Sequence, residues 1–259
     1  MDRPPTLLES GLRHDRAILV AVLVLVPLLC WIWIVLMARD MYGAMNGPSA
    51  WMMTLTWDAR HLLLFWAMWA VMMTGMMLPA AAPLVLLYGG AARRRADGER
   101  SALDVYALAS GYVFVWAVFS VGATVLQRML AGVWVLSPMM ELSNPAASAA
   151  LLVVAGAYQL TPLKTVCLQS CQAPVAFLSR HWRTGTAGAF RMGVTHGLYC
   201  VGCCWALMLL LFAGGVMNLG VIVALTLLVT AEKLALFGAQ GNRVTGALLI
   251  MLGVWVFAR

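Results

Sequence analysis

Charged residues are scarce in this sequence. Asp, Glu, Lys and Arg make up 10% of the 259 residues, whereas 63% are hydrophobic. A soluble domain carries roughly a quarter charged residues, so this composition excludes an ordinary soluble protein. Several uncharged stretches reach the length of about 20 residues at which a helix crosses a bilayer. The sequence therefore predicts an all-α, polytopic bundle of transmembrane helices surrounded by lipid.

Motifs of nucleotide and acyl hydrolysis are also missing. The chain has neither a Gly-x-x-x-x-Gly-Lys-Ser/Thr phosphate-binding loop nor a Gly-x-Ser-x-Gly nucleophile elbow. An ATP-driven pump is therefore not expected, and a binding or transport protein is favoured over an enzyme. The net charge of +7 comes from residues in short loops. A nucleic-acid partner is not expected, because it would require a basic face on a soluble surface.

Seven stretches are candidate spans, or six if the last does not cross. Two of them share a long segment without charge, so its Gly214, Gly215, Asn218 and Gly220 are expected to form a hairpin turn. Pro79 and Pro83 are expected to kink or end the second span. The predicted spans lie at 17–37, 62–92, 105–127 and 142–163, then in two halves of 192–231, and at 244–258.

We expect one membrane domain over residues 1–259. It comprises an N-terminal span and outer loop at 1–60, a core at 61–240, and the last span at 241–259. With the N-terminus in the cytoplasm, the inner segments would hold thirteen Lys and Arg residues and the outer segments four. The positive-inside rule therefore favours a cytoplasmic N-terminus.

Five of the six cysteines form two clusters, and both lie near the cytoplasmic side of this topology. Thiols stay reduced there, which disfavours structural disulfides. In the fifth span, residues four apart share a helix face, and this face presents thioether, imidazole and thiol groups. Such soft donors fit copper(I), with zinc as the alternative. The stripe consists of Met192, His196, Cys200, Cys204 and Met208, with Cys203 beside it.

The other cluster follows a predicted helix start. Thr161 is a suitable N-cap and Pro162 a suitable first helical residue, so Cys167 and Cys171 would share one face of a new short helix. Lys164 lies one turn before Cys167, where its charge would favour a thiolate. Glu232, at the end of the sixth span, is a candidate partner for Lys164. We expect thiols of the two clusters to meet, with Lys164 and Glu232 as auxiliary residues.

A methionine repeat in the second span adds weaker soft donors. Met68, Met72 and Met76 recur at steps of four residues. Methionine also fills irregular gaps between helices, so packing is the alternative interpretation. We include Met72 and Met76 among the candidate metal ligands.

Several motifs together resemble one known family. The sequence is similar, over about residues 60–240, to bacterial integral membrane proteins described as predicted metal-binding proteins of unknown function. The resemblance implies a bacterial inner membrane location and supplies no reaction; the N-terminal and last spans fall outside it. It rests on Met68-Trp69, Met72-Met73 and Met76-Met77-Leu78-Pro79; on Tyr158-Gln159 through Lys164 with Cys167 and Cys171; on His196-Gly197-Leu198, Cys200 and Gly202-Cys203-Cys204-Trp205-Ala206-Leu207-Met208; and on Met217-Asn218 and Glu232-Lys233.

Three functional hypotheses follow from these residues. The leading one is a protein that binds copper(I) between the fourth and fifth spans and passes it across the membrane, or to a partner such as a soluble metal chaperone. The second is a thiol-disulfide carrier of electrons that uses Cys167/Cys171 and Cys200/Cys204. The third is a scaffold subunit of a membrane complex with a structural zinc ion.

Overall fold

The computed structural model describes residues 7–43, 58–93, 98–132, 140–235 and 240–259. Within these ranges the regular elements are nine helices and no strands, which agrees with the predicted all-α class. The helices are α1 (Leu7–Tyr42), α3 (Ala59–Arg93), α4 (Gly98–Gly132), α5 (Pro145–Gln159), α6 (Pro162–Gln172), α7 (Pro174–His181), α8 (Gly185–Gly214), α9 (Leu219–Lys233) and α10 (Gly241–Ala258).

Five of the described helices, α1, α3, α4, α8 and α10, are long and apolar enough to cross a membrane. A sixth crossing results if α5 and α6, which meet at a bend of 66°, count as one broken span. The predicted total of seven is not confirmed, because α9 has only 15 residues. A helix of that length spans about 22 Å, less than the hydrocarbon core of about 30 Å.

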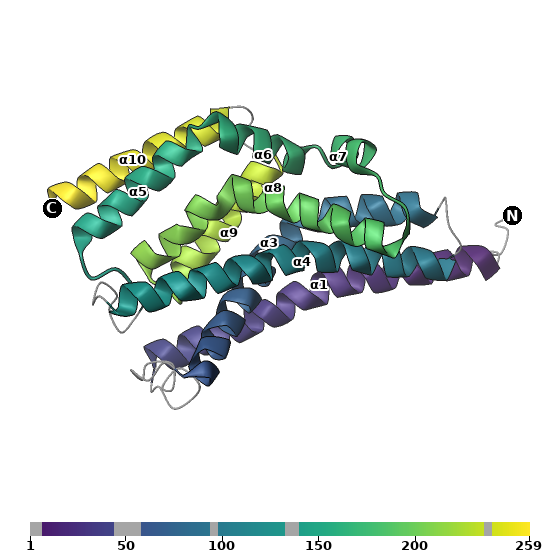
Figure 1. Cartoon of the computed structure of the whole chain (residues 1–259), viewed down its shortest axis with the longest axis horizontal. Coiled ribbons are helices and arrows are strands. Elements are labelled where there is room, and N and C mark those ends of the chain that lie inside the picture. The colour runs from purple at the N-terminus through teal and green to yellow at the C-terminus, as the bar shows by residue number, and fades with distance from the viewer. Residues whose placement is uncertain (1–6, 44–57, 94–97, 133–139, 236–239) are drawn as a thin grey trace, which may run out of the picture.

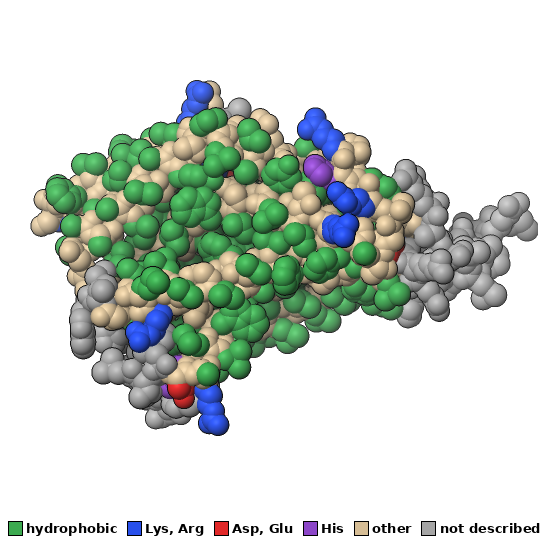
Figure 2. Space-filling view, in the orientation of Figure 1, with side chains coloured by type: hydrophobic (Ala, Val, Ile, Leu, Met, Phe, Trp, Pro, Cys, Tyr) green, Lys and Arg blue, Asp and Glu red, His purple; other side chains and the backbone are tan. Residues whose placement is uncertain are grey.

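The long helices lie side by side in one bundle. Figure 1 shows α1, α3, α4, α8 and α9 running along the longest axis, while α5 and α10 form an antiparallel pair along one edge. The visible outer surface is largely hydrophobic, and the Lys and Arg side chains gather toward its margins (Figure 2). The predicted inner loops are only partly described. The side chains of Arg3, Arg13, Arg16, Arg94, Arg95 and Arg100 lie outside the described residues.

Helix α3 continues through both of its prolines, so of the two expected effects, a kink or an end of the helix, the end at Pro79 or Pro83 does not occur. A proline removes a backbone hydrogen bond, but tertiary packing can hold the helix on both sides of it. Met77, Leu78 and Ala81 are all buried around Pro79. The start of α3 is fixed by Asp58, whose carboxylate accepts hydrogen bonds from the backbone N–H and ring Nδ1 of His61. These bonds hold the pKa of Asp58 below its usual range.

The turn between α8 and α9 forms where the glycines predict it. Helix α8 ends at Gly214, and Gly215 follows with a φ of 91°, which only glycine adopts at low cost. Asn218 then caps α9, because its side-chain oxygen accepts hydrogen bonds from the backbone of Gly220 and Val221. Thr161 caps α6 in the same way, by accepting from Lys164 N at 3.3 Å. Both local predictions are confirmed.

Glycines bring α4 and α8 into backbone contact. A Cβ atom at Gly193 would lie 2.0 Å from the carbonyl oxygen of Leu108, and one at Gly111 would lie 2.2 Å from that of Phe190. Small residues at such crossings allow closer approach of helices than larger side chains permit. This contact places Tyr112 of α4 directly against the cysteine-bearing part of α8.

Candidate metal centre

Thiols of the two cysteine clusters meet between α6 and α8. Cys200, Cys203 and Cys204 of α8 are buried, and Cys171 of α6 reaches across to interact with the thiols of Cys200 and Cys203. The Cys200 thiol also interacts with those of Cys203 and Cys204. All the cysteines of the described chain are free. The cross-helix meeting expected from the sequence therefore occurs, between Cys171 of α6 and the thiols of α8.

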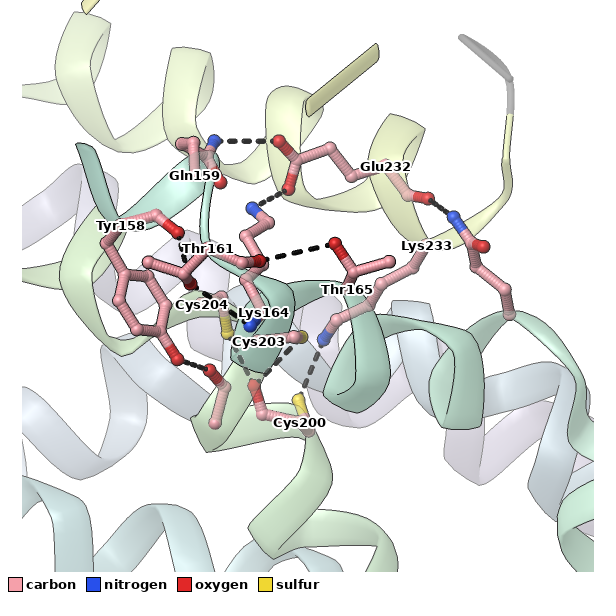
Figure 3. Close-up of polar contacts among 12 residues, drawn as sticks. Tyr158, Gln159, Thr161, Lys164, Thr165, Cys200, Cys203, Cys204, Glu232 and Lys233 are labelled. Carbon is pink, nitrogen blue, oxygen red and sulfur yellow. Dashed lines mark hydrogen bonds and ion pairs between the residues drawn. The ribbon is translucent and has the colours of Figure 1, made fainter. Parts of the chain in front are cut away.

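Local hydrogen bonds fix the thiols of α8. The thiols of Cys203 and Cys204 both donate to the backbone carbonyl of Cys200, at 3.1 Å and 2.9 Å (Figure 3). The fifth thiol lies over Gly202, where an added Cβ would come within 2.8 Å of Cys167 Sγ. Because Gly202 has no side chain, Cys167 of α6 can lie close to the backbone of α8.

Helices α3, α4 and α9 complete the surroundings of Cys200. Lys233, the last residue of α9, places its Nζ 2.8 Å from Cys200 Sγ and 3.6 Å from the Met77 thioether of α3. The Tyr112 hydroxyl lies 3.0 Å from Cys200 Sγ and 3.0 Å from the carbonyl oxygen of Met77, to which it donates. An ammonium at this distance stabilises a thiolate on Cys200. Cys200 is therefore the electrostatic centre of the cluster.

A buried ion pair lies one layer above the thiols. Lys164 Nζ is 2.6 Å from Glu232 Oε2, and both side chains are shielded from solvent. Gln159 Nε2 donates to the other carboxylate oxygen at 2.8 Å, and Gln172 Nε2 donates to the backbone carbonyl of Glu232 at 2.7 Å. The pairing of Lys164 with Glu232 is the one that the sequence suggested. It ties α5 and α6 to the end of α9, where Lys233 follows directly.

His196 lies one turn before Cys200 and is only 4% exposed. Its ring packs against those of Phe177 and Tyr112, with centroids 5.0 Å and 5.7 Å away. Its Nδ1 atom has no hydrogen-bond partner among the described residues. Burying a polar atom without a hydrogen-bond partner lowers the stability of the fold by about 1–3 kcal/mol, and binding of a ligand at this nitrogen would offset that cost.

The predicted methionines are all buried, but they do not form one group. The Met192 thioether accepts a hydrogen bond from the backbone N–H of Arg183 at 3.1 Å, and its helix position is about 12 Å from that of Cys200. Met208 lies one turn beyond Cys204, and Met72 and Met76 lie in the core of α3. The thioether linked to the thiols through Lys233 is that of Met77.

The geometry offers pairs of ligands. Among the described His, Cys, Asp and Glu side chains, no group of three or more is arranged to hold a single ion. Structural zinc sites need four ligands in a tetrahedron. Copper(I), a soft ion that prefers thiolates and thioethers, also forms stable complexes with only two such ligands.

A comparison with known families agrees with this chemistry. The sequence model of the family PpoB2, described as a copper chaperone, matches residues 66–256, which is well over half of the chain. The chain belongs to this copper chaperone family. No curated protein and no solved structure matches it.

Membership of the PpoB2 copper chaperone family corrects one expectation from the sequence. The last span was placed outside the family resemblance, but the match to PpoB2 continues to residue 256, almost to the end of α10. Helix α10 packs on α5 through Gly246, where an added Cβ would lie 2.9 Å from the carbonyl oxygen of Gly156. Helix α10 therefore supports α5, the helix that precedes α6.

Met77, Tyr112 and Lys233 are not among the ligands and auxiliary residues predicted from the sequence. One signal was available for Lys233, because Lys164 and Lys233 are the only lysines among the 17 Lys and Arg residues. Arginine serves at every other basic position, so lysine at two buried positions indicates a need for a compact ammonium group. Tyr112 and Met77 gave no comparable signal, since they are placed by helix packing.

The buried ion pair makes a testable contribution to stability. We expect Glu232→Gln to lower the free energy of unfolding by about 2–3 kcal/mol, because the amide still accepts a hydrogen bond but leaves the Lys164 ammonium without a counter-charge. Thermal unfolding of the purified protein in detergent measures the loss. The matched control is Asp104→Asn, whose carboxylate accepts from Thr186 near the surface. An equal effect of the two substitutions would contradict a special role for the buried pair.

Proposed function

We propose that this protein is a multi-pass inner-membrane protein that binds copper(I) at the thiols between α6 and α8 and delivers it to another protein or across the membrane. The N-terminus is cytoplasmic in this proposal. The ligand pool comprises Cys167, Cys171, His196, Cys200, Cys203 and Cys204, joined by the thioether of Met77.

One observation carries the proposal. The half-buried Cys171 of α6 and the buried thiols of α8 converge without forming a group of three or more ligands for one ion, in the part of the chain that the structure describes. Two thiolates from different helices bind copper(I) strongly. An ion held by few ligands can leave by exchanging them one at a time, whereas an ion in a closed tetrahedral site cannot. Delivery requires such exchange.

The burial of the thiols favours a direction for that exchange. Cys200, Cys203 and Cys204 are buried, whereas Cys167 and Cys171 on α6 are half-buried. An acceptor protein would therefore meet the α6 thiols first. On the other side, α3 supplies the thioether of Met77 beside Lys233, with the buried Met76 next to it in sequence and Met72 about one turn earlier. Thioethers bind copper(I) more weakly than thiolates, so this order would pass the ion toward the cysteines.

Metal content tests the proposal directly. The full chain, produced with added copper and purified in detergent under reducing conditions, is expected to retain copper in stoichiometric amount by mass spectrometry. The double variant Cys200→Ser, Cys204→Ser should lose at least about nine-tenths of it, since serine oxygen is a poor ligand for a soft ion. Cys30→Ser, which changes the half-buried cysteine of α1, is the matched control and should retain the metal.

Other outcomes point to the alternatives. Zinc retained in place of copper would favour the scaffold with a structural ion. The electron carrier has one observation in its favour, because Cys171 approaches Cys200 from another helix and so avoids the poor geometry of a disulfide within one helix. A metal-free protein whose Cys171 and Cys200 oxidise reversibly as a pair would overturn the copper proposal and support that carrier.

A further inference from the structure

Lys233 is a buried cation that forms no ion pair with any carboxylate of the described residues. Its side chain is 5% exposed, and its polar contacts are the Cys200 thiol and the Met77 thioether. The neighbouring carboxylate, Glu232, is bonded to Lys164 and Gln159 instead. Consecutive residues on a helix point in different directions, which explains why Glu232 does not reach Lys233.

The buried charges around the thiols can be summed from these contacts. Among the described residues, the buried Lys, Arg, Asp and Glu side chains are Lys164, Glu232 and Lys233, and the first two neutralise each other. Lys233 therefore leaves one positive charge beside Cys200. Two thiolates, the set needed to hold copper(I), bring the total to one negative charge. A monovalent cation makes the site neutral, whereas a divalent cation leaves it with a net positive charge.

We propose that Lys233 is a specificity-determining residue that restricts the thiol site to monovalent soft cations and so discriminates against divalent zinc. This inference rests on the proposed function, because it assumes that these thiols bind a metal. Its physical basis is the low effective dielectric of a buried site, in which one uncompensated charge is costly. Lys233 stabilises the anionic complex of copper(I) with two thiolates and opposes any complex with an additional positive charge.

The extra positive charge of a divalent ion could be neutralised only by a further negative ligand. A third thiolate would neutralise it, but no three of the described ligand side chains are arranged around one point. The thiols of Cys203 and Cys204 each donate a hydrogen bond to the backbone carbonyl of Cys200. With two thiolates as the ligands of one ion, the charge of Lys233 decides which ion they accept.

The first experiment uses the unmodified full chain and two ions of similar softness but different charge. Silver(I) and cadmium(II) are titrated into the reduced, detergent-purified protein, and binding is followed by competition with copper(I). We expect silver(I) to displace copper(I), and cadmium(II) and zinc(II) to bind at least about a hundredfold more weakly, the scale of one unit charge a few ångströms away in a buried site. Equal binding of silver(I) and cadmium(II) would overturn the inference while leaving metal binding itself intact.

Variants then assign the discrimination to Lys233. Lys233→Met and Lys233→Gln remove the charge, and either should raise the affinity for cadmium(II) and zinc(II) at least about tenfold relative to copper(I). Lys233→Arg keeps the charge and should keep the discrimination. Arg191→Met removes a positive charge from the exposed face of α8, the helix that carries Cys200, and is the matched control.

The outcomes separate this inference from the proposed function. Absence of any metal binding by the parent chain would reject both. Discrimination in the parent that persists in folded Lys233→Met or Lys233→Gln protein would reject the role of Lys233 alone. If neither neutral variant folds, the titration of the parent chain and the Lys233→Arg variant still test the inference. Loss of the discrimination in Lys233→Arg, which keeps the positive charge, would contradict it.

Discussion

Replacing Cys200 with alanine will destabilise the protein by about 3–5 kcal/mol, far more than the loss of one small side chain, because it leaves a buried ammonium unpaired. Among the described residues, the hydrogen-bonding contact that Lys233 then retains is the Met77 thioether, 3.6 Å from its Nζ. Adding Lys233→Met to Cys200→Ala should restore most of the lost stability, since an apolar pair of similar volume tolerates burial. Thermal unfolding of the metal-free protein in detergent provides the measurement.

Two further variants complete this cycle. Lys233→Met alone should cost less than Cys200→Ala alone, because an uncharged thiol tolerates an apolar neighbour. Cys30→Ala, on α1, should change stability by no more than about 1 kcal/mol, as is usual for a substitution without a named mechanism. Additive effects of Cys200→Ala and Lys233→Met would show that the two side chains do not interact, and the electrostatic description of the site would be wrong.

The second large effect concerns the packing of α4 on α8. Gly193→Ala adds a single Cβ atom, which would lie 2.0 Å from the carbonyl oxygen of Leu108 and 3.0 Å from the backbone nitrogen of Tyr112. Backbone atoms cannot move aside as a flexible side chain would. We therefore expect a loss above about 3 kcal/mol, the upper end of ordinary overpacking, or failure to accumulate folded protein. Because α4 also carries Tyr112, its contact with Cys200 should be lost as well.

Gly122→Ala is the matched control for this substitution. It lies on the exposed face of α4, where an added Cβ meets nothing within 4 Å. Alanine is about 1 kcal/mol better than glycine inside a helix, so Gly122→Ala should leave stability unchanged or raise it. The yield of monodisperse protein in detergent and its thermal unfolding are compared for both variants. Equal behaviour would show that α4 and α8 are not in backbone contact.

Local signals in the sequence predicted local structure well. Thr161 and Pro162 predicted the start of α6, and the glycines with Asn218 predicted the turn into α9. These features depend on hydrogen bonds and backbone angles of a few consecutive residues, which the residue types set directly. The continuation of α3 through Pro79 and Pro83, by contrast, was not set by local preference. Their local preference was overridden by packing of the buried residues around them.

The composition by itself determined the class of this protein, because a chain with so little charge and such long apolar stretches buries its backbone polar groups in helices. Helical spacing also determined that Cys200 and Cys204, one turn apart, share a face of α8. Only the tertiary structure decided which side chains from other helices surround Cys200. Tyr112 reaches it because glycine contacts set how closely α4 approaches α8, and Lys233 reaches it because the short α9 ends at the depth of the thiols. Spacing along one helix carries no information about the rotation and depth of its neighbours, which are set by packing.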